Sequence, residues 1–200
     1  MISWLHKQRL DAALGRVRES GARSILDLGC GDGDFLIRLA QEPQIERIVG
    51  IDINRNSLDR LRERLGAIKG KRMAQVHLNH GSITESDAAL AGFDCAVLIE
   101  TIEHLPPDRL PSLERTVFIE ARPQTVVVTT PNAEFNQLLG VPSRRFRHPG
   151  HRFEWDRATF REWAHDVAAR NAYKVRCSDI AGQHPMIGGA SQMAVFKAAR

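Results

Sequence analysis

Cysteine is scarce in this sequence, with three residues among 200. Cys30, Cys95 and Cys177 lie far apart, and no two of them form a Cys-x-x-Cys pair. Isolated cysteines argue against a disulfide scaffold and against a structural zinc finger, both of which need several cysteines at fixed spacing. The sequence therefore favours a reducing, cytoplasmic environment.

Long hydrophobic runs are also missing. No apolar stretch approaches the ~18 residues that a membrane-spanning helix needs, and residues 1–7 lack the apolar core of a signal peptide. With 15 glycines and 9 prolines, the chain has too little of either for a collagen-like or disordered protein. At 42% hydrophobic residues it predicts a single globular domain over 1–200, without a membrane partner.

Strand-like and helix-like segments alternate along the chain. Seven segments are typical of strands: 24–28, 47–51, 73–78, 93–99, 124–130, 173–177 and 192–196. Helices are predicted at 35–41, 55–65, 106–120 and 156–171, after an N-terminal helix within 1–21 that Ser3 would cap. This order predicts an α/β fold with a mostly parallel seven-stranded sheet and helices on both faces. The last two strands, with no helix between them, predict an antiparallel hairpin at one edge. Residues 131–154 show little periodicity and are expected to form an active-site loop.

A glycine-rich turn follows the first predicted strand, in the order Asp27, Gly29, Gly31, Gly33. Glycines at this point allow a tight turn and a close approach of a ligand to the backbone. Asp34 stands where the dinucleotide fingerprint requires a third glycine, and Asp27 would repel a pyrophosphate. The turn therefore favours a ligand with an ammonium group and no phosphate.

A second acid, Asp52, ends the second predicted strand 19 residues after Gly33. A carboxylate there can accept hydrogen bonds from both hydroxyls of a ribose. A nucleoside with an amino-acid tail is S-adenosylmethionine, and the pattern resembles the Rossmann-like class I methyltransferases that use it. Ser82, after the third strand, falls where that class usually contacts adenine.

The fourth strand ends in Glu100-Thr101-Ile102-Glu103-His104. A helical turn would place Glu100, Glu103 and His104 on one face, where two carboxylates and an imidazole could hold Mg²⁺ or Mn²⁺. A fourth ligand could come from His148 or His151. The alternative is an ordinary solvated helix face.

The net charge is +4, and positive charge is concentrated at 144–157, where five arginines and two histidines alternate with aromatic residues. Guanidinium groups that contact phosphates, beside rings that stack on bases, fit a single-stranded RNA end. The alternative is a solvated basic loop. The aromatic candidates for stacking are Phe146 and Phe153, whereas Trp4, Trp155, Trp163 and Tyr173 are expected in the core.

Several longer blocks resemble the HEN methyltransferases, which methylate the 2′-hydroxyl of the 3′-terminal ribose of small RNAs. The blocks are 27–33, 81–94, 99–110, 129–136, 147–164 and 191–196, and the EHLPPDRL and GHRFEW segments are the most specific. The likeness is closest to the catalytic domain of bacterial members. At 200 residues, the chain is expected to contact RNA through the catalytic face rather than a separate module.

The resemblance implies a set of roles. The metal ligands would be Glu100, Glu103, His104 and His151, with His148 outside the ligand shell. His104 or His151 would take the proton of the 2′-hydroxyl. Asp27, Gly29, Gly31, Gly33, Asp52 and Ser82 would bind the cofactor, and Arg144, Arg145, Arg147 and Arg152 the RNA. Family members usually have Asp before the last histidine, where this chain has Gly150. Proteins of RNA-repair or small-RNA pathways are the implied partners.

Two rival functions remain at this stage. One is a metal-dependent O-methyltransferase acting on a small-molecule diol or a catechol-like substrate, which has no use for the arginines at 144–157. The other is a non-catalytic subunit that binds RNA or a protein, which would not need both the glycine turn and the acidic cluster. A comparison of RNA with a free nucleoside or a catechol as methyl acceptor distinguishes the first rival from an RNA methyltransferase. Titration with the cofactor distinguishes the second rival, which would not bind it.

Overall fold

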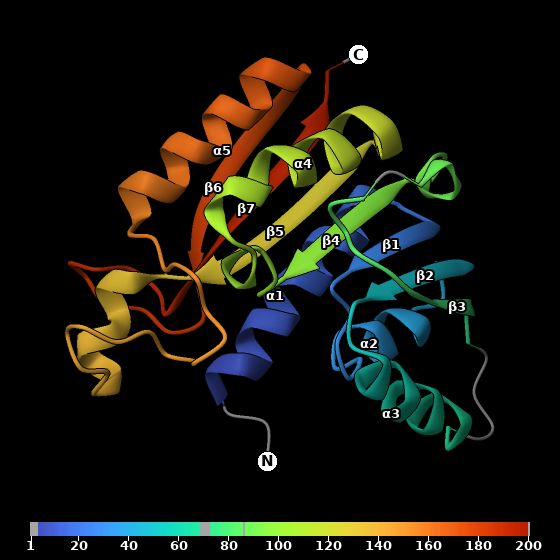
Figure 1. Cartoon of the computed structure of the whole chain (residues 1–200), viewed down its shortest axis with the longest axis horizontal. Coiled ribbons are helices and arrows are strands. Elements are labelled where there is room, and N and C mark those ends of the chain that lie inside the picture. The colour runs from blue at the N-terminus through green and yellow to red at the C-terminus, as the bar shows by residue number, and fades with distance from the viewer. Residues whose placement is uncertain (1–3, 69–72, 86, 200) are drawn as a thin grey trace.

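The computed structural model describes residues 4–68, 73–85 and 87–199. Its centre is a seven-stranded sheet in the order β3-β2-β1-β4-β5-β7-β6 (Figure 1). The strands are β1 (Ser24–Leu28), β2 (Arg47–Asp52), β3 (Gln75–His80), β4 (Cys95–Ile99), β5 (Thr125–Pro131), β6 (Tyr173–Ile180) and β7 (Ser191–Ala198). The first five strands pair in parallel, and β7 pairs antiparallel with both β5 and β6. The predicted α/β architecture and its antiparallel edge are confirmed.

The helices are α1 (Trp4–Ser20), α2 (Leu36–Ala40), α3 (Arg55–Gly66), α4 (Leu110–Glu114) and α5 (Arg157–Asn171). Short 3-10 helices are η1 (Ala88–Leu90), η2 (Ile102–His104), η3 (Pro107–Arg109) and η5 (Ala133–Leu139), and η4 (Arg115–Ala121) is a π-helix. Within the described ranges, no helix is both long and apolar enough to cross a membrane. Ser3, the predicted cap of the first helix, lies outside the described residues.

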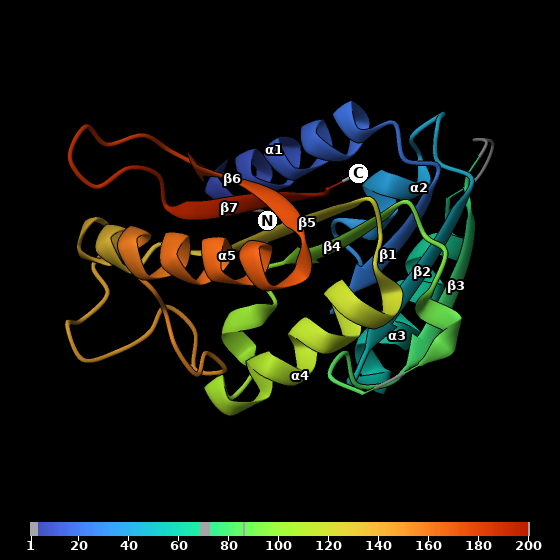
Figure 2. The same cartoon turned by 90° about the horizontal axis from the view of Figure 1, so that it is seen from above.

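The helices form two layers, one on each face of the sheet. Buried side chains of α1, α2 and α3 pack with strand residues such as Ile25 and Val97 on one face. Those of α4, η4 and α5 pack with strand residues such as Leu98 and Val128 on the other. Figure 2 shows α1 and the pair α4 and α5 on opposite sides of the strands. Because both faces are covered, the central strands are almost wholly apolar.

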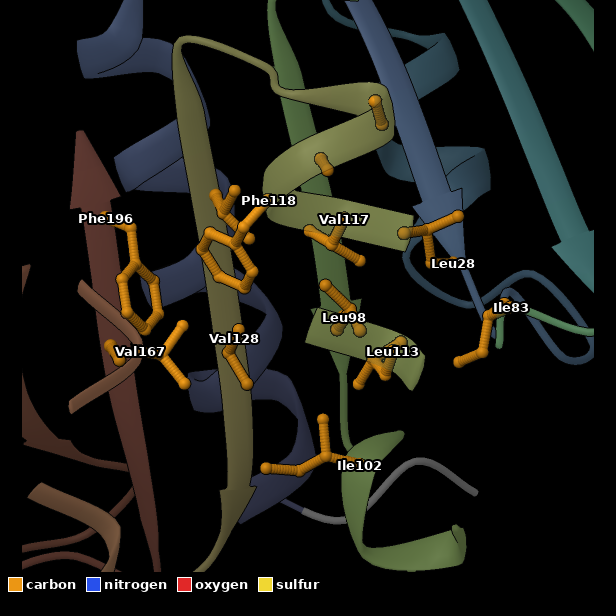
Figure 3. Packing of buried hydrophobic residues seen from close by; sticks show 14 of the residues in the cluster. Leu28, Ile83, Leu98, Ile102, Leu113, Val117, Phe118, Val128, Val167 and Phe196 are labelled. Carbon is orange, nitrogen blue, oxygen red and sulfur yellow. The ribbon is translucent and has the colours of Figure 1, made fainter. Parts of the chain in front are cut away.

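The larger core lies under α4, η4 and α5 (Figure 3). Phe118 from η4 meets the Phe196 ring of β7 edge to face, with ring centroids 5.0 Å apart. Ile102 belongs to the same core and is fully buried. Because Ile102 lies between the predicted metal ligands Glu100 and Glu103 in the sequence, its packing in the core helps to fix the backbone that carries them.

Several predicted segments differ from the structure in their bounds, such as β4, which begins at Cys95 rather than Phe93, and β6, which continues to Ile180. The third strand begins at Gln75 rather than Met73. Its residues alternate between exposed and half-buried, so apolar content is a poor guide to its ends. The helix predicted over 106–120 is divided into η3, α4 and η4, with Pro111 in the first turn of α4. The segment 131–154, for which no regular structure was expected, contains η5, which Asn132 caps by accepting from the Glu134 amide.

Candidate active site

The strand order places a crevice beside β1 and β4. The chain passes from β3, on one side of β1, to β4 on the other, and parallel sheets bind ligands at the carboxyl ends of the strands where this reversal occurs. A cavity of about 720 Å³ lies there, which is ample for a nucleoside-sized ligand. Its walls come from the turns after β1, β2, β3 and β4, and from His6 and Leu10 of α1.

The glycine turn forms the floor of this cavity. The amides of Gly29 and Cys30 both donate to the Ile51 carbonyl, at 2.8 and 3.0 Å, which fastens the turn to β2. Gly31 has a φ of +53°, and a Cβ built on it would meet nothing within 4 Å, so the backbone here is open to a ligand. A Cβ on Gly29 would lie 2.4 Å from Thr101 Cγ2, so this position accepts only glycine.

All six residues predicted to bind the cofactor line the cavity: Asp27, Gly29, Gly31, Gly33, Asp52 and Ser82. Asp52 accepts hydrogen bonds from the amides of Gly31 and Asn54, both at 2.8 Å, which fix its carboxylate at the cavity wall. The Ser82 hydroxyl lies 2.9 Å from the Thr84 hydroxyl. The structure therefore gathers residues from three strand ends around one space.

Asp27 is the least solvated of these groups, with 2% exposure. Its Oδ2 atom is buried and has no hydrogen-bond partner among the described residues. Burial raises the pKa of Asp27 to about 7, and the nearby Asp52 charge adds to this effect. A carboxyl group in this state is suited to a ligand that brings a positive charge.

The second group of predicted residues lies at the end of β4, where Glu100 and His104 line the same cavity. Glu100 has a left-handed φ of +53°, so it precedes η2 rather than joining a helical turn. Its carboxylate pairs with Arg9 of α1, with Nη2 to Oε2 at 3.3 Å. Glu103 is fully buried and accepts from the Thr130 hydroxyl at 3.0 Å. Burial raises the pKa of Glu103 well above its usual range, and the Glu100 charge raises it further.

Three histidines gather next to these acids. His104, His148 and His151 each offer a ring nitrogen, and the three nitrogens lie within 4.8 Å of one another. The His148 ring lies beside the other two, with its centroid 5.5 Å from that of His151 and 5.6 Å from that of His104, and its place outside the ligand shell stays a prediction. The Arg152 amide donates to the Glu103 carbonyl at 2.7 Å, which fastens the histidine-bearing loop to η2.

The donor set fits a hard divalent cation. Glu100 and Glu103 each have a buried Oε1 atom without a hydrogen-bond partner in the described part of the chain, so both carboxylates could turn to a cation. Carboxylate oxygens together with imidazole suit Mg²⁺ or Mn²⁺ better than a structural zinc site. The two carboxylates are not within the 4.8 Å grouping of the three histidine nitrogens.

The predicted RNA-binding arginines divide into two kinds. Arg144, Arg145 and Arg152 are exposed, whereas the Arg147 guanidinium points inward. Arg147 donates to the carbonyls of Asn132 and Ala190 and to the Asn136 side chain. Because the protein itself occupies these donors, Arg147 anchors the loop.

The aromatic residues were predicted with mixed success. Phe146 is 47% exposed and free to stack on a base, but Phe153 is buried and stacks on Trp155, with centroids 4.3 Å apart. Trp4 is 66% exposed, so its assignment to the core was wrong, because it occupies the first turn of α1 before that helix reaches the sheet. Tyr173 is buried, as expected.

Sequence reasoning missed Arg9, Thr130 and Glu154. Arg9 lies 91 residues before Glu100 in the chain, and nothing in its local sequence indicates the ion pair. Glu154 accepts from His151 Nδ1 and from the Asn136 amide. Burial opposes its ionisation, but these hydrogen bonds prevail and hold the pKa of Glu154 below its usual value. The position of Glu154 three residues after His151 was the one available signal.

Comparison with known proteins agrees with this geometry. The sequence model described as a methyltransferase domain matches residues 26–119. The solved methyltransferase domain of a bacterial Hen1, CtHen1, is 35% identical with a TM-score of 0.86, over 96% of this chain and 99% of that one. The chain belongs to the Hen1 methyltransferase family. Its fold is accordingly that of the class I, S-adenosylmethionine-dependent methyltransferases.

Longer Hen1 relatives match over nearly the whole chain. The small RNA 2′-O-methyltransferase of Gallus gallus is 37% identical over 203 residues, covering 96% of this chain and 53% of that protein. The solved small RNA methyltransferase HEN1 is 36% identical with a TM-score of 0.90, over 97% of this chain and 26% of that one. The chain thus spans about half the length of the curated animal relatives that it matches.

Proposed function

We propose that this Hen1-family domain transfers a methyl group from S-adenosylmethionine to the 2′-hydroxyl of the 3′-terminal ribose of RNA, with Mg²⁺ or Mn²⁺. The observation that carries the proposal is the pair of carboxylates Glu103, which is fully buried, and Glu100, which is 17% exposed, each with a buried oxygen that has no hydrogen-bond partner in the described part of the chain. Three histidines gather near them, and two of these, His104 and His148, line the cofactor cavity. Taking a carboxylate out of water costs on the order of several kcal/mol of solvation free energy, so a bound cation is the natural partner of this pair.

The cofactor residues have separable roles in this proposal. The Asp27 carboxylate faces the ammonium group of the amino-acid tail, and the open backbone at Gly31 lets the tail lie close to the turn. Asp52, held by two amides, accepts from the ribose hydroxyls of the cofactor. Ser82 lies at the adenine end of the cavity.

The metal-binding residues would be Glu100, Glu103, His104 and His151. When bound, the cation would lower the pKa of a hydroxyl group that it contacts and hold that group in place. A 3′-terminal ribose offers two neighbouring hydroxyls for this purpose, whereas a 2′-deoxy or 3′-phosphorylated end offers fewer.

His104 is suited to accept the proton of the 2′-hydroxyl, and His151 is the second candidate. Burial lowers the pKa of His104, and the neighbouring His151 lowers it further, so the ring is neutral at physiological pH. A neutral imidazole has one lone pair, which serves either the cation or the proton, so the histidine that acts as general base would not coordinate the cation while it accepts the proton.

RNA would be held by the exposed arginines Arg144, Arg145 and Arg152, with Phe146 as a stacking surface. Segment 131–154 would act as the active-site loop of a single methyltransferase domain over 1–200. We also propose partners from RNA-repair or small-RNA pathways and a cytoplasmic location. The name of the curated relatives, small RNA 2′-O-methyltransferase, supports small-RNA partners.

The deciding experiment is methyl transfer from labelled S-adenosylmethionine to a synthetic RNA, compared with the same RNA carrying a 2′-deoxy end. We expect transfer only to the ribose end, loss of transfer with EDTA and recovery with Mn²⁺. Transfer to a free catechol or diol, but not to RNA, would support the small-molecule alternative. Failure to bind the cofactor would support the non-catalytic alternative.

Substitution of the proposed metal ligands gives a separate prediction. We expect Glu100→Ala, Glu103→Ala, His104→Ala and His151→Ala each to reduce transfer at least about a hundredfold, because each removes one ligand, while cofactor affinity stays near that of the wild type. Titration with cofactor and single-turnover transfer measure the two quantities. His165→Ala, on the exposed face of α5, is the control. Near-normal transfer in any two ligand variants would contradict the metal site.

A further inference from the structure

His148 belongs to the histidine cluster and to the cavity wall at the same time. It lines the cavity together with His104, whereas His151 does not. It is also more exposed than His151. His148 is therefore placed to meet whatever enters the cavity from solvent, and its chemistry depends on which of its ring nitrogens carries a hydrogen.

The hydrogen-bond partners of the two other histidines determine their tautomers. His104 Nδ1 lies 3.2 Å from the Gly150 carbonyl oxygen, which can only accept, so this nitrogen carries the hydrogen. His151 Nδ1 contacts the Glu154 carboxylate, which also accepts. In both rings the Nε2 atom is left with a lone pair, which is what a metal ligand or a base needs.

His148 has the opposite arrangement. Its Nδ1 accepts a hydrogen bond of 3.0 Å from the Gly150 amide, so the hydrogen of the neutral ring is on Nε2. An Nε2–H group has no lone pair for a cation. The Nε2–H group of His148 is a hydrogen-bond donor, and none of the described residues accepts from it.

Gly150 makes this arrangement fit. A Cβ on residue 150 would lie 3.0 Å from His148 Nδ1 and 3.2 Å from His104 Nδ1. Both contacts are tighter than ordinary packing allows, so a side chain here would push the two rings apart. The same glycine therefore supplies the carbonyl that orients His104 and the amide that orients His148, and leaves room for both.

Resting on the proposed function, we infer that His148 is a substrate-binding residue, not a metal ligand: its Nε2–H donates to an oxygen of the 3′-terminal nucleotide of RNA. Both the terminal ribose and the last phosphate offer such oxygens. The three exposed arginines of the same loop, Arg144, Arg145 and Arg152, indicate that the bound nucleotide approaches from this side.

The test compares RNA binding with metal binding in the full chain. RNA affinity is read from the fluorescence anisotropy of a 5′-labelled RNA with S-adenosylhomocysteine, so no transfer occurs, and metal affinity from Mn²⁺ titration. We expect His148→Ala to weaken RNA binding about tenfold, the size of one hydrogen bond to a polar or charged acceptor, with unchanged Mn²⁺ affinity. His148→Gln, which keeps an N–H near the Nε2 position, should recover most of the loss. His151→Ala should lose Mn²⁺ affinity, whereas the control His165→Ala should keep both the RNA affinity and the Mn²⁺ affinity of the wild type.

Modified RNAs identify the acceptor. If the tenfold difference disappears with a 2′-deoxy, a 3′-deoxy or a 2′,3′-dideoxy end, the acceptor is a ribose hydroxyl oxygen. If it disappears with a methylphosphonate at the last linkage, the acceptor is the phosphate. A difference that survives all of these changes overturns the inference, as does a fall in Mn²⁺ affinity in His148→Ala or an RNA affinity equal to the wild type. Because these are binding measurements, wild-type protein that binds RNA but fails to methylate it would contradict the proposed function alone.

Discussion

Asp27 shows how one residue can be costly to the fold and useful to the ligand site. Its carboxyl group is 2% exposed, with one buried oxygen unpartnered within the described ranges. Burial raises its pKa to about 7 from an ordinary value near 4. The folded protein therefore holds a proton that the unfolded chain releases, so stability falls as pH rises from about 4 to 7 and stays lower above that.

This predicts the behaviour of Asp27→Asn. The amide cannot ionise, so the ligand-free variant should be more stable than the wild type at pH 8, by about 1–3 kcal/mol, and no more stable at pH 4. Wild-type affinity for S-adenosylmethionine should rise with pH through about 7, and the variant should bind weakly at every pH. Thermal melts and calorimetric titration between pH 5.5 and 8.5 measure both effects. A wild-type affinity that does not change with pH would refute the role given to Asp27.

Helix α1 contributes both to the cofactor cavity and to the acidic cluster of Glu100 and Glu103. His6 and Leu10 line the cavity, and Arg9 pairs with Glu100 while its Nε donates to the Ser191 hydroxyl at 3.0 Å. The Arg9 and Glu100 side chains are 14% and 17% exposed, so solvent screens their attraction only partly. Arg9 therefore offsets part of the charge of Glu100.

Arg9→Met tests this role. The variant should lose about 1–3 kcal/mol of stability without metal, because Glu100 loses its ion pair while it stays close to Glu103. Saturating Mn²⁺ should narrow the difference between the two melting temperatures. Arg16→Met, which removes an exposed pair with Glu19 on the same helix, should change stability by less than about 1 kcal/mol with or without metal. Equal losses in the two variants would count against the coupling of α1 to the site.

The strands of the sheet and the motif after β4 were the features most easily predicted from the sequence. Strands such as β4 and β5 are short runs of apolar and β-branched residues between helices, and they predict the parallel sheet directly. The motif of Glu100, Glu103 and His104 was found because its members are neighbours in the chain. Nothing in the sequence indicates the Arg9 ion pair or the inward direction of Arg147, because both depend on partners from distant segments.

For the whole molecule, the net charge of +4 matters through its location. Three exposed arginines, Arg144, Arg145 and Arg152, belong to the same loop as His148 and His151. Charge at this place would draw a phosphate backbone toward the site, and contacts of this kind weaken with salt because bound counterions are released.

A triple variant measures this contribution. Replacing Arg144, Arg145 and Arg152 by Ala should reduce the slope of log affinity against log salt by about 2, from ~0.7 per phosphate contact on a single strand. The matched control removes three exposed arginines elsewhere, Arg16, Arg62 and Arg115, for the same change in net charge. An equal change of slope in both variants would mean that overall charge, and not this loop, governs RNA binding.

The position of α1 has a practical consequence for assays. Trp4 begins this helix on the side of the molecule where β4 and β5 end, next to the cavity wall at His6, whereas β7 runs the other way and ends at Ala198 on the far side (Figure 1). An affinity tag or surface tether joined before α1 would start beside the cavity opening and compete with RNA for access. Attachment after β7 leaves that opening free, so immobilised protein should be coupled through the C-terminal end.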